Sequence, residues 1–332
     1  MIEIKKYQKV ADIPKEWDSV IGDNLYLSIE FLAFIERVED YGQKYYAVYD
    51  GGKIDTVFMT YQLSAYNMAM FTKFNLPRKT TMVYIPLSVS RPSIAYGKHL
   101  SAVFDYLKGI KGPKMVLNLG DLKVKGYAKG LTCPKCILTN RFSSFDGYMS
   151  SLRSGYRRRY KTALNKSANL TLEFLDDNQK FSEEEYACYL QVYEKSQLKL
   201  EKLPIEFFRG KYFKIFTLKL DGKSVGFCQL LPNGDELIFE FVGVDYAYND
   251  EYDVYHRILL EIVRYGIENG FKTIDFGQTA DESKLKLGAK YVTLYAYLHD
   301  SNPIMNCINK MLAPVIEYKP IKTEFNVFKE NV

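Results

Sequence analysis

The chain has 332 residues, of which 47% are hydrophobic, and its formal net charge is +5. This length allows two domains of ordinary size, and the composition excludes a disordered or fibrous protein. The first ten residues lack the apolar stretch of a signal peptide, and the apolar runs are too short to cross a bilayer. We therefore expect a cytoplasmic protein without a membrane span.

The first half predicts a mixture of helices and strands. Ser28 precedes apolar residues at helical spacing, which indicates a helix with a serine N-cap. Gly51 and Gly52 separate two strand-like runs and indicate a hairpin. The predicted elements are, in order, a strand at 2–7, a helix after Ser28, hairpin strands at 44–50 and 54–63, a helix at 99–110 and a strand at 115–120.

The second half follows a similar order. A connection at 141–150 leads into a basic helix at 151–166. Ser182 and Glu185 have the spacing of a capping box, which predicts the start of a further helix. The predicted elements that follow are a helix at 182–200, strands at 214–220, 224–231 and 236–245, a helix at 254–269, and strands at 273–277 and 291–298.

Two blocks of the sequence repeat each other. The stretches 99–120 and 256–277 each start at His, run through an amphipathic helix and a Gly turn, and end in a short strand closed by Gly. The offset is the same at both ends, which indicates two related domains in tandem. We place them at 1–145 and 146–332. Each is α+β, because a doubly wound sheet would alternate strands and helices more regularly.

Five cysteines are present, and one pair, Cys133 and Cys136, forms a C-x-x-C motif. Such a motif is redox-active in some proteins and half of a zinc site in others. The sequence has no second C-x-x-C or paired His to complete a zinc site, and the motif lies in a strand-like stretch rather than at the start of a helix. We expect structural thiols and no metal.

Positive charge is concentrated near the middle of the chain. The stretch between Gly147 and Leu172 has no acidic residue. Its field would attract an anion such as a phosphate, a nucleotide-bearing cofactor or RNA, and the alternative is an ordinary solvated helix face. The basic residues are Arg153, Arg157, Arg158, Arg159, Lys161 and Lys166.

Four stretches of the second half carry a family resemblance. They are SSFDGYMSSLRSGYRRRYKTALNK, DGKSVGFCQLL with ELIFEFVGVD, ENGF with KTIDFG, and TADESKLKLGAKYVTLYAYL. In this order they resemble the GNAT (N-acyltransferase) fold, in its double-domain branch of Fem-type peptidoglycan-bridge transferases and cell-envelope acetyltransferase-like proteins. The likeness covers 145–300. It extends to the first half only through the internal repeat. It implies tandem GNAT-like domains, each a mixed, mainly antiparallel sheet flanked by helices, with the active cleft in the second.

The resemblance implies an acyl-CoA donor, possibly acetyl-CoA. GNAT enzymes hold the donor pyrophosphate at the N-terminus of the central helix, usually through a glycine-rich loop. This chain has no glycine between Gly243 and Gly266, and Asp250, Glu251 and Asp253 would repel a pyrophosphate. Aminoacyl-tRNA is therefore the alternative donor, with the basic helix as an RNA contact.

The resemblance also implies catalytic residues. Glu240 occupies the strand position of a general base, and a backbone N–H of Val242 or Gly243 would face the thioester oxygen. Because Phe239 and Phe241 flank Glu240, alternation predicts that both rings face opposite to the carboxylate. The alternative for Glu240 is an outward-facing strand residue.

Two further residues complete the expected catalytic group. Asp275 at a strand end would orient the acceptor amine, or else cap a turn. The equivalent position of the repeat in the first half is Asn118. Lys284 matches the lysine of the "yK..lG" pattern, in which Gly288 is the glycine, and would stabilise an oxyanion or contact phosphate. Lys286 lies two residues further on and could be mistaken for this lysine, but it does not match the pattern.

Donor-binding residues are expected around this group. Arg153 and Arg157 lie four apart and share a helix face. Gly277 closes the "dfG" strand. His99 and His256 repeat each other, which is more typical of shared packing than of catalysis, so neither is included.

The predicted function is transfer of an acyl or aminoacyl group from a thioester or ester donor to an amine of a cell-envelope or saccharide precursor. The acceptor attacks directly, because no Ser–His–Asp or Cys–His spacing supports a covalent intermediate. The partners are a small acyl donor and an amine, with tRNA possible and DNA not expected. The alternatives are a Fem-type aminoacyl-tRNA-dependent ligase, although its coiled-coil insertion is not evident, and a non-catalytic binding protein of the same fold.

Overall fold

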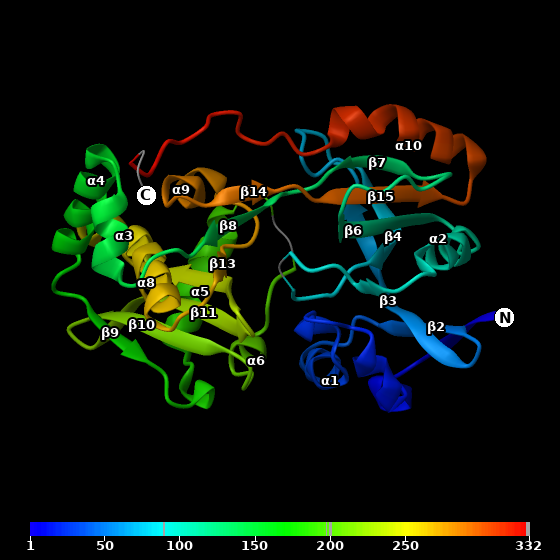
Figure 1. Cartoon of the computed structure of the whole chain (residues 1–332), viewed down its shortest axis with the longest axis horizontal. Helices are drawn as coiled ribbons and strands as arrows, with labels where there is room; N and C mark the ends of the chain where they lie inside the picture. The colour runs from blue at the N-terminus through cyan, green and yellow to red at the C-terminus, as the bar shows by residue number, and fades with distance from the viewer. Residues whose placement is uncertain (89, 197, 199–200, 330–332) are drawn as a thin grey trace. The chain divides into compact units, whose positions relative to one another are not determined.

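A computed structural model describes residues 1–88, 90–196, 198 and 201–329. The chain divides into two compact units, each built on one β-sheet (Figure 1). Unit 1 comprises Met1–Pro134 and Thr293–Pro320, and unit 2 comprises Lys135–Val292 and Ile321–Val332.

The units interleave along the chain and so differ from the division expected at residue 145. Strand β8 (Lys135–Thr139) precedes that position, yet it pairs with β13 and β14 of unit 2. Strand β15 (Tyr295–Asp300) follows it, yet it pairs with β6 and β7 of unit 1. Backbone hydrogen bonds join strands that are distant in sequence, so a boundary read from the repeat alone does not capture this arrangement.

The sheet of unit 1 has the order β1-β2-β3-β4-β6-β15-β7, with β5 beside β3. Its neighbouring strands are antiparallel except for β4 and β6. The remaining bounds are β1 Ile2–Tyr7, β2 Lys44–Asp50, β3 Lys53–Asn67, β4 Pro77–Val83, β5 Ile94–Tyr96, β6 Pro113–Leu119 and β7 Ala128–Leu131.

The helices of unit 1 are α1 (Ile29–Val38), α2 (Leu100–Lys108) and α10 (Pro303–Ile316). Short 3₁₀ segments at Val10–Asp12, Lys15–Ser19 and Leu25–Leu27 precede α1. The Ser28 hydroxyl accepts a hydrogen bond from the Phe31 N–H at 3.2 Å, so the predicted N-cap is confirmed.

The sheet of unit 2 has the order β14-β8-β13-β12-β11-β10-β9. Strands β12 and β13 are parallel, and the other neighbours are antiparallel. The remaining bounds are β9 Thr171–Phe174, β10 Lys214–Leu220, β11 Lys223–Asn233, β12 Glu236–Val244, β13 Thr273–Asp275 and β14 Lys290–Val292. The helices are α3 Phe145–Ser151, α4 Ser154–Lys166, α5 Glu183–Lys195, α6 Ile205–Phe208, α7 Tyr246–Tyr252, α8 Val254–Glu268 and α9 Asp281–Lys286, with a 3₁₀ segment at Asn178–Lys180.

Three predicted elements differ from the structure. The connection expected at 141–150 contains most of α3, and the basic helix expected from residue 151 begins at Ser154. The helix expected over 182–200 ends at Lys195, and its residues 197, 199 and 200 lie outside the described residues. The strand expected over 291–298 is two strands, β14 and β15, which join different sheets.

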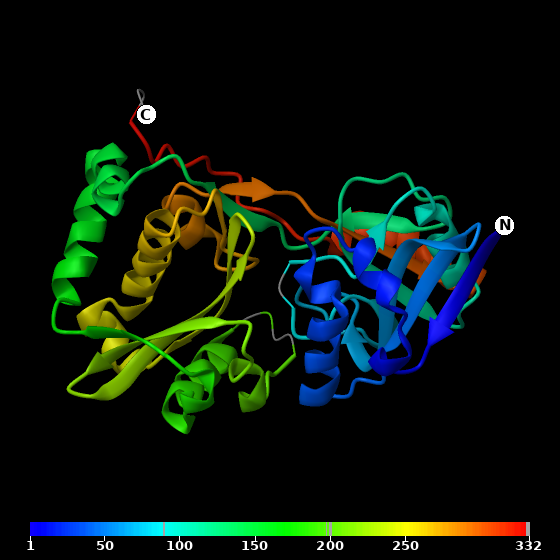
Figure 2. The ribbon, with the colours of Figure 1, turned by 60° about the horizontal axis from the view of Figure 1, so that its bottom comes forward.

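Helices cover both faces of the sheet in unit 2. Phe239 of β12 belongs to the apolar core that includes the buried face of α8. Phe241 instead contacts the rings of Tyr189 on α5 and of Phe207 and Phe208 on α6. Helices α8 and α5 therefore lie on opposite faces, as Figure 2 shows for the yellow and green helices beside the yellow-green strands.

The start of α5 is fixed by the predicted capping box, which is confirmed. Glu185 is buried, and its carboxylate accepts hydrogen bonds from the Ser182 backbone N–H at 2.9 Å and from the Ser224 hydroxyl at 2.5 Å. Burial alone would raise the pKa of Glu185, but the hydrogen bonds from Ser182 and Ser224 lower it below its usual value.

We expect Glu185→Gln to weaken the acid sensitivity of the fold. A carboxylate whose folded-state pKa is lowered stabilises the protein above its unfolded pKa of about 4.3, and this contribution is lost as the pH falls below that value. The urea midpoint should therefore drop less between neutral pH and about pH 3.5 in the variant than in the wild type. Glu183→Gln, an exposed neighbour in the same turn, is the control, and an equal drop in all three proteins would contradict the prediction.

Candidate functional site

The two central strands of unit 2 part after a short parallel stretch. Strand β12 pairs with β13 from Glu236 to Ile238, opposite Thr273–Asp275. Strand β13 then ends, whereas β12 continues to Val244. The edge of β12 beyond Ile238 is thus not paired with β13, and backbone groups at such an edge can bind an extended ligand.

Glu240 is the extra residue of a β-bulge in this part of β12. Leu230 of β11 pairs with Phe239, and its neighbour Gln229 pairs with Phe241, so Glu240 is left between the two pairs. The Glu240 side chain is buried, with 5% of its surface exposed. Bulges re-aim side chains and are common beside active sites. The prediction that Phe239 and Phe241 share one face is wrong, because the bulge interrupts the alternation and sends the two rings to opposite faces.

Lys284 lies where the two strands part. It belongs to α9 and is buried, with 3% exposed. Its Nζ donates a hydrogen bond to the carbonyl oxygen of Gln278 at 2.7 Å and lies 5.8 Å from the centroid of the Phe239 ring. A desolvated ammonium in this position provides a fixed positive charge beside β12.

Asp275 forms a buried ion pair at the end of β13. Its side chain is fully buried, and Oδ2 lies 2.9 Å from Nζ of Lys135 on β8. The other oxygen, Oδ1, accepts a hydrogen bond from the Gly277 N–H at 2.8 Å. Lys135 also lies 3.9 Å from Oε1 of Glu236. These contacts join three strands, and a role of Asp275 in orienting the acceptor stays a prediction.

A pocket of about 250 Å³ lies among α4, the first turn of α8 and α9. Arg159 Nη2 lies 3.2 Å from Nε2 of His256, and the hydroxyl of Tyr160 donates to the carbonyl oxygen of Lys286 at 2.6 Å. Arg159 and Lys286 supply two basic side chains beside the His256 imidazole, and an anion bound here would replace the Glu282 carboxylate that lies 2.5 Å from Lys286 Nζ. Its lining residues are Gly155, Tyr156, Arg159, Tyr160, His256, Ser283 and Lys286.

The N-terminus of α8 is already occupied by side chains of the protein. Asp253 is the N-cap residue, in a left-handed conformation with φ 52°, and its Oδ1 lies 2.8 Å from Nδ1 of His256 rather than bonding to the backbone of the helix. This hydrogen bond lowers the pKa of Asp253 against the opposing effect of burial, with help from Arg159 and Lys166. The Tyr255 N–H donates to Oδ1 of Asn249 at 3.0 Å. This helix end therefore carries a negative charge, as the acidic sequence predicted.

Residues 150–285 match the family model for the acetyltransferase (GNAT) domain. This stretch is a GNAT domain. The match confirms the predicted acyltransferase class, and the two mixed, mostly antiparallel sheets agree with the predicted fold. No curated protein matches the sequence significantly.

Solved structures share the fold over most of the chain. FemX aligns with 92% of this chain and 100% of its own, at 12% identity and a TM-score of 0.53. A conserved protein of unknown function from Bacteroides thetaiotaomicron aligns with 90% and 100%, at 12% identity and 0.52. The C-terminal domain of an Agrobacterium fabrum protein assigned as a lysylphosphatidylglycerol synthetase aligns with 82% and 88%, at 10% identity and 0.50. At these identities the likeness concerns the fold.

Two glycines predicted to bind the donor are required by packing. A Cβ on Gly243 would lie 2.2 Å from the Phe227 ring and 2.7 Å from the backbone nitrogen of Tyr189. Gly288 has φ +94°, and a Cβ there would lie 2.3 Å from the Phe328 ring. Both positions therefore need glycine whatever they bind. Val242 pairs with Cys228 in the sheet.

The predicted arginines lie outside the pocket lining. Arg153 is the N-cap residue of α4, and its Nε donates to the carbonyl oxygen of Phe328 at 3.0 Å. Arg157 Nη1 donates to the carbonyl oxygen of Ser150 at 3.3 Å. Gly277, with φ 67°, turns the chain after β13. A role of these residues in donor binding stays a prediction.

Sequence reasoning set aside three residues that line the pocket of the GNAT domain. Arg159 was considered only as one of three consecutive arginines, and His256 was attributed to shared packing. Lys286 was not matched to the lysine of the family pattern. The signal that could have found them is their placement on the helices of the family motif. Their convergence depends on how α4, α8 and α9 pack.

The C-x-x-C motif shows the properties of buried thiols. Cys133 and Cys136 are both buried thiols and form no disulfide. Burial raises the pKa of Cys136 to about 12, so the thiol is protonated and poorly nucleophilic. Among the residues that the structure describes, no group of three His, Cys, Asp or Glu side chains could hold a metal ion.

Proposed function

We propose that this protein transfers an acyl or aminoacyl group from an ester or thioester donor to an amine of a cell-envelope or saccharide precursor. One observation supports it most: the buried Lys284 of α9 lies beside β12 at the point where β12 and β13 part, and other residues of α9 line the pocket. Ser283 and Lys286 line the pocket, and Lys284 lies between them in the sequence. The GNAT domain and the names of the FemX and synthetase structures favour the same class of reaction.

The proposed reaction is direct attack of an amine on the donor carbonyl. Glu240 accepts the proton that the attacking nitrogen loses. Lys284 and a backbone N–H of Val242 or Gly243 stabilise the oxyanion of the tetrahedral intermediate. Collapse of this intermediate forms the amide and releases a thiolate, or an alcohol that takes up the proton held by Glu240, with no covalent bond to the enzyme. A cytoplasmic location would suit five cysteines that form no disulfide.

The donor is either acyl-CoA or aminoacyl-tRNA. The negatively charged N-terminus of α8 disfavours the usual pyrophosphate site and favours the tRNA, a phosphate of which Arg159 of α4 would contact at the pocket. A thermal-shift titration with acyl-CoA and a filter-binding titration with aminoacyl-tRNA distinguish the two donors. Binding of neither would favour the non-catalytic alternative and contradict the proposal.

We expect Arg159→Ala with Lys286→Ala to weaken donor binding about tenfold, because each loses one charged contact to phosphate. Arg158→Ala removes an exposed arginine from the same helix that does not line the pocket, and should bind within about twofold of the wild type. Equal losses in both proteins would show that the general charge of α4, rather than the pocket, holds the donor.

A further inference from the structure

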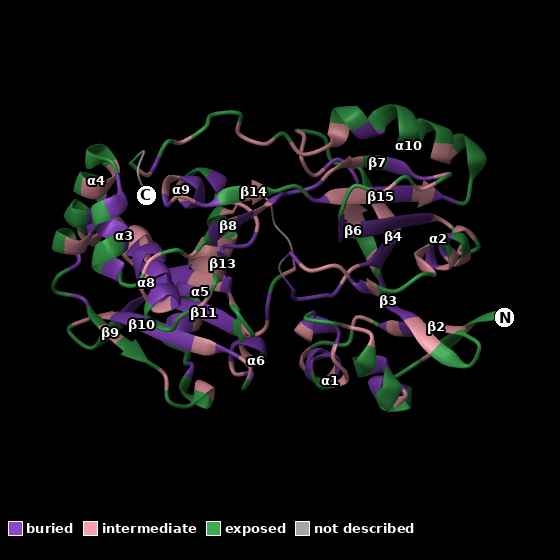
Figure 3. Cartoon of the chain, in the orientation of Figure 1, coloured by how far each residue is buried: buried purple, intermediate pink, exposed green. Residues whose placement is uncertain are grey.

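Helix α10 of unit 1 exposes apolar side chains and buries a polar one, which is the reverse of an ordinary surface helix. Its buried residues are Asn309 and Ala313, while large apolar side chains face outward. A surface helix normally buries its apolar stripe and exposes polar residues. Figure 3 shows this helix largely in the colour of exposed residues. The exposed apolar residues, with their exposed fractions, are Ile304 72%, Ile308 38%, Met311 72%, Leu312 39% and Val315 64%.

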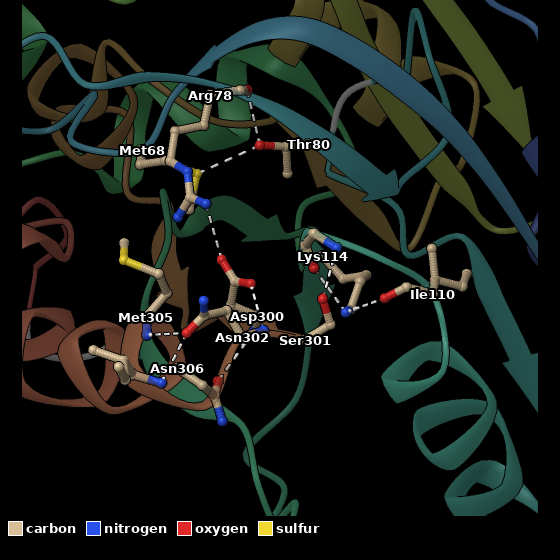
Figure 4. A network of polar contacts seen from close by, with 12 residues as sticks. Met68, Arg78, Thr80, Ile110, Lys114, Asp300, Ser301, Asn302, Met305 and Asn306 are labelled. Carbon is tan, nitrogen blue, oxygen red and sulfur yellow. Dashed lines mark hydrogen bonds and ion pairs between the residues drawn. The ribbon is translucent and has the colours of Figure 1, made fainter.

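The inward face of α10 is held by a polar network, which fixes the apolar face outward (Figure 4). The side chain of Asn302 caps the helix by accepting from the Ile304 and Met305 N–H groups. Asn306 accepts from the Asp300 N–H at 3.1 Å and donates to the carbonyl oxygen of Gly126 at 2.9 Å. Asp300, 2% exposed, is paired with Arg78 at 3.0 Å. The orientation of the helix is therefore set by specific contacts.

Lysines border this apolar face. The helix, Pro303–Ile316, contains no acidic residue, and its one charged residue is the exposed Lys310. Two loops adjoin the start of the helix. The Gly112 N–H donates to the Ser301 hydroxyl, and the Asn306 side chain donates to the carbonyl oxygen of Gly126. Both loops carry exposed lysines. These lysines are Lys111, Lys123 and Lys125, and Lys319, which lies 3.1 Å from Glu317, follows the helix.

A second exposed apolar segment adjoins the end of α10. The ring of Phe71 lies 5.3 Å from the ring of Tyr318, two residues after the helix. The turn that follows Phe71 exposes Phe74, at 71%, and Leu76, at 48%. It also carries the exposed Lys73.

We propose that α10 binds the surface of an anionic lipid bilayer, with its apolar face in the interface and the bordering lysines against the headgroups. A 14-residue helix is too short to span a bilayer, and an apolar face bordered by Lys is typical of helices that lie in the interface. The positive charge of this surface distinguishes an anionic bilayer from a second copy of the chain as the binding partner. A two-fold contact through this face would bring the lysines of one copy toward those of the other, whereas anionic lipids complement them. This site is separate from the proposed acyl transfer and does not depend on it.

Vesicle flotation of the full chain tests the proposal. The wild type should float with vesicles of equal parts phosphatidylglycerol and phosphatidylcholine, and only weakly with phosphatidylcholine alone. Met311→Glu with Val315→Glu should reduce the bound fraction about tenfold. The control is Ile2→Glu, which places one such charge on an exposed apolar residue of β1 and should bind like the wild type.

Three outcomes would overturn the proposal. The first is a wild type that does not float with anionic vesicles, and the second is a double variant that floats as well as the wild type. The third is a concentration-dependent dimer in sedimentation that the double variant abolishes, because α10 would then bind a second copy. Circular dichroism melting of each variant establishes that the changes at exposed positions leave the fold intact.

Discussion

Lys135→Met is expected to lower the free energy of unfolding by about 3 kcal/mol, because it removes the ion-pair partner of a fully buried carboxylate. Asp275 is 0% exposed and lies 2.9 Å from the Lys135 ammonium, which is itself 12% exposed. The pair joins β8 to β13 across the sheet of unit 2. Urea unfolding followed by circular dichroism measures the loss.

A double-mutant cycle identifies the cause of that loss. Adding Asp275→Asn to Lys135→Met removes the buried charge and should recover part of the lost stability. Lys290→Met changes an exposed lysine on the neighbouring strand β14 and should cost less than about 0.5 kcal/mol. The prediction fails if Lys135→Met unfolds like Lys290→Met, since Asp275 would then be stabilised by other contacts.

Lys284→Met is expected to lower the turnover of acyl transfer about 100-fold, if the proposed function holds. Loss of one group that stabilises an oxyanion typically costs a factor of this size. The ammonium is held beside β12 by the Gln278 carbonyl, and methionine keeps most of its volume in the buried site. Single-turnover kinetics on a donor that the wild type uses measure the chemical step directly.

Lys286 provides the matched control for this prediction. It lies two residues further along α9 and lines the basic pocket. Lys286→Met should raise KM for the donor and leave turnover within about threefold of the wild type, because its contact is the same in ground and transition states. Unchanged turnover in a folded Lys284→Met protein would remove Lys284 from the mechanism without affecting the pocket.

Local patterns in the sequence predicted several parts of this protein well. The caps at Ser28 and Ser182 depend on residues within one turn of each other, so they can be recognised without tertiary contacts. The order of strands and helices in the second half was sufficient to indicate the GNAT fold. The acidic start of α8 was also evident, and the structure adds that Asp253 is paired with His256 there.

Other features depend on contacts between distant residues. The bulge at Glu240 is visible only in the pairing of β12 with β11, and it reverses the expected facing of Phe239 and Phe241. Likewise, Asp275 and Lys135 are 140 positions apart. Their pairing follows from the place of β8 in the sheet of unit 2. The predicted boundary at residue 145 would have assigned β8 to the first domain.

By itself the sequence determined the α+β class, the GNAT resemblance of the second half and the charge of the basic helix, because periodicity, capping and composition are local properties. Only the tertiary structure decided which strands each unit contains, which basic residues converge on one pocket and which face of α10 is exposed. Strand pairing and helix packing bring together side chains that no sequence spacing relates, and the pocket consists of such side chains. The apolar residues of α10 do share a helical spacing, but tertiary packing decided that they face outward.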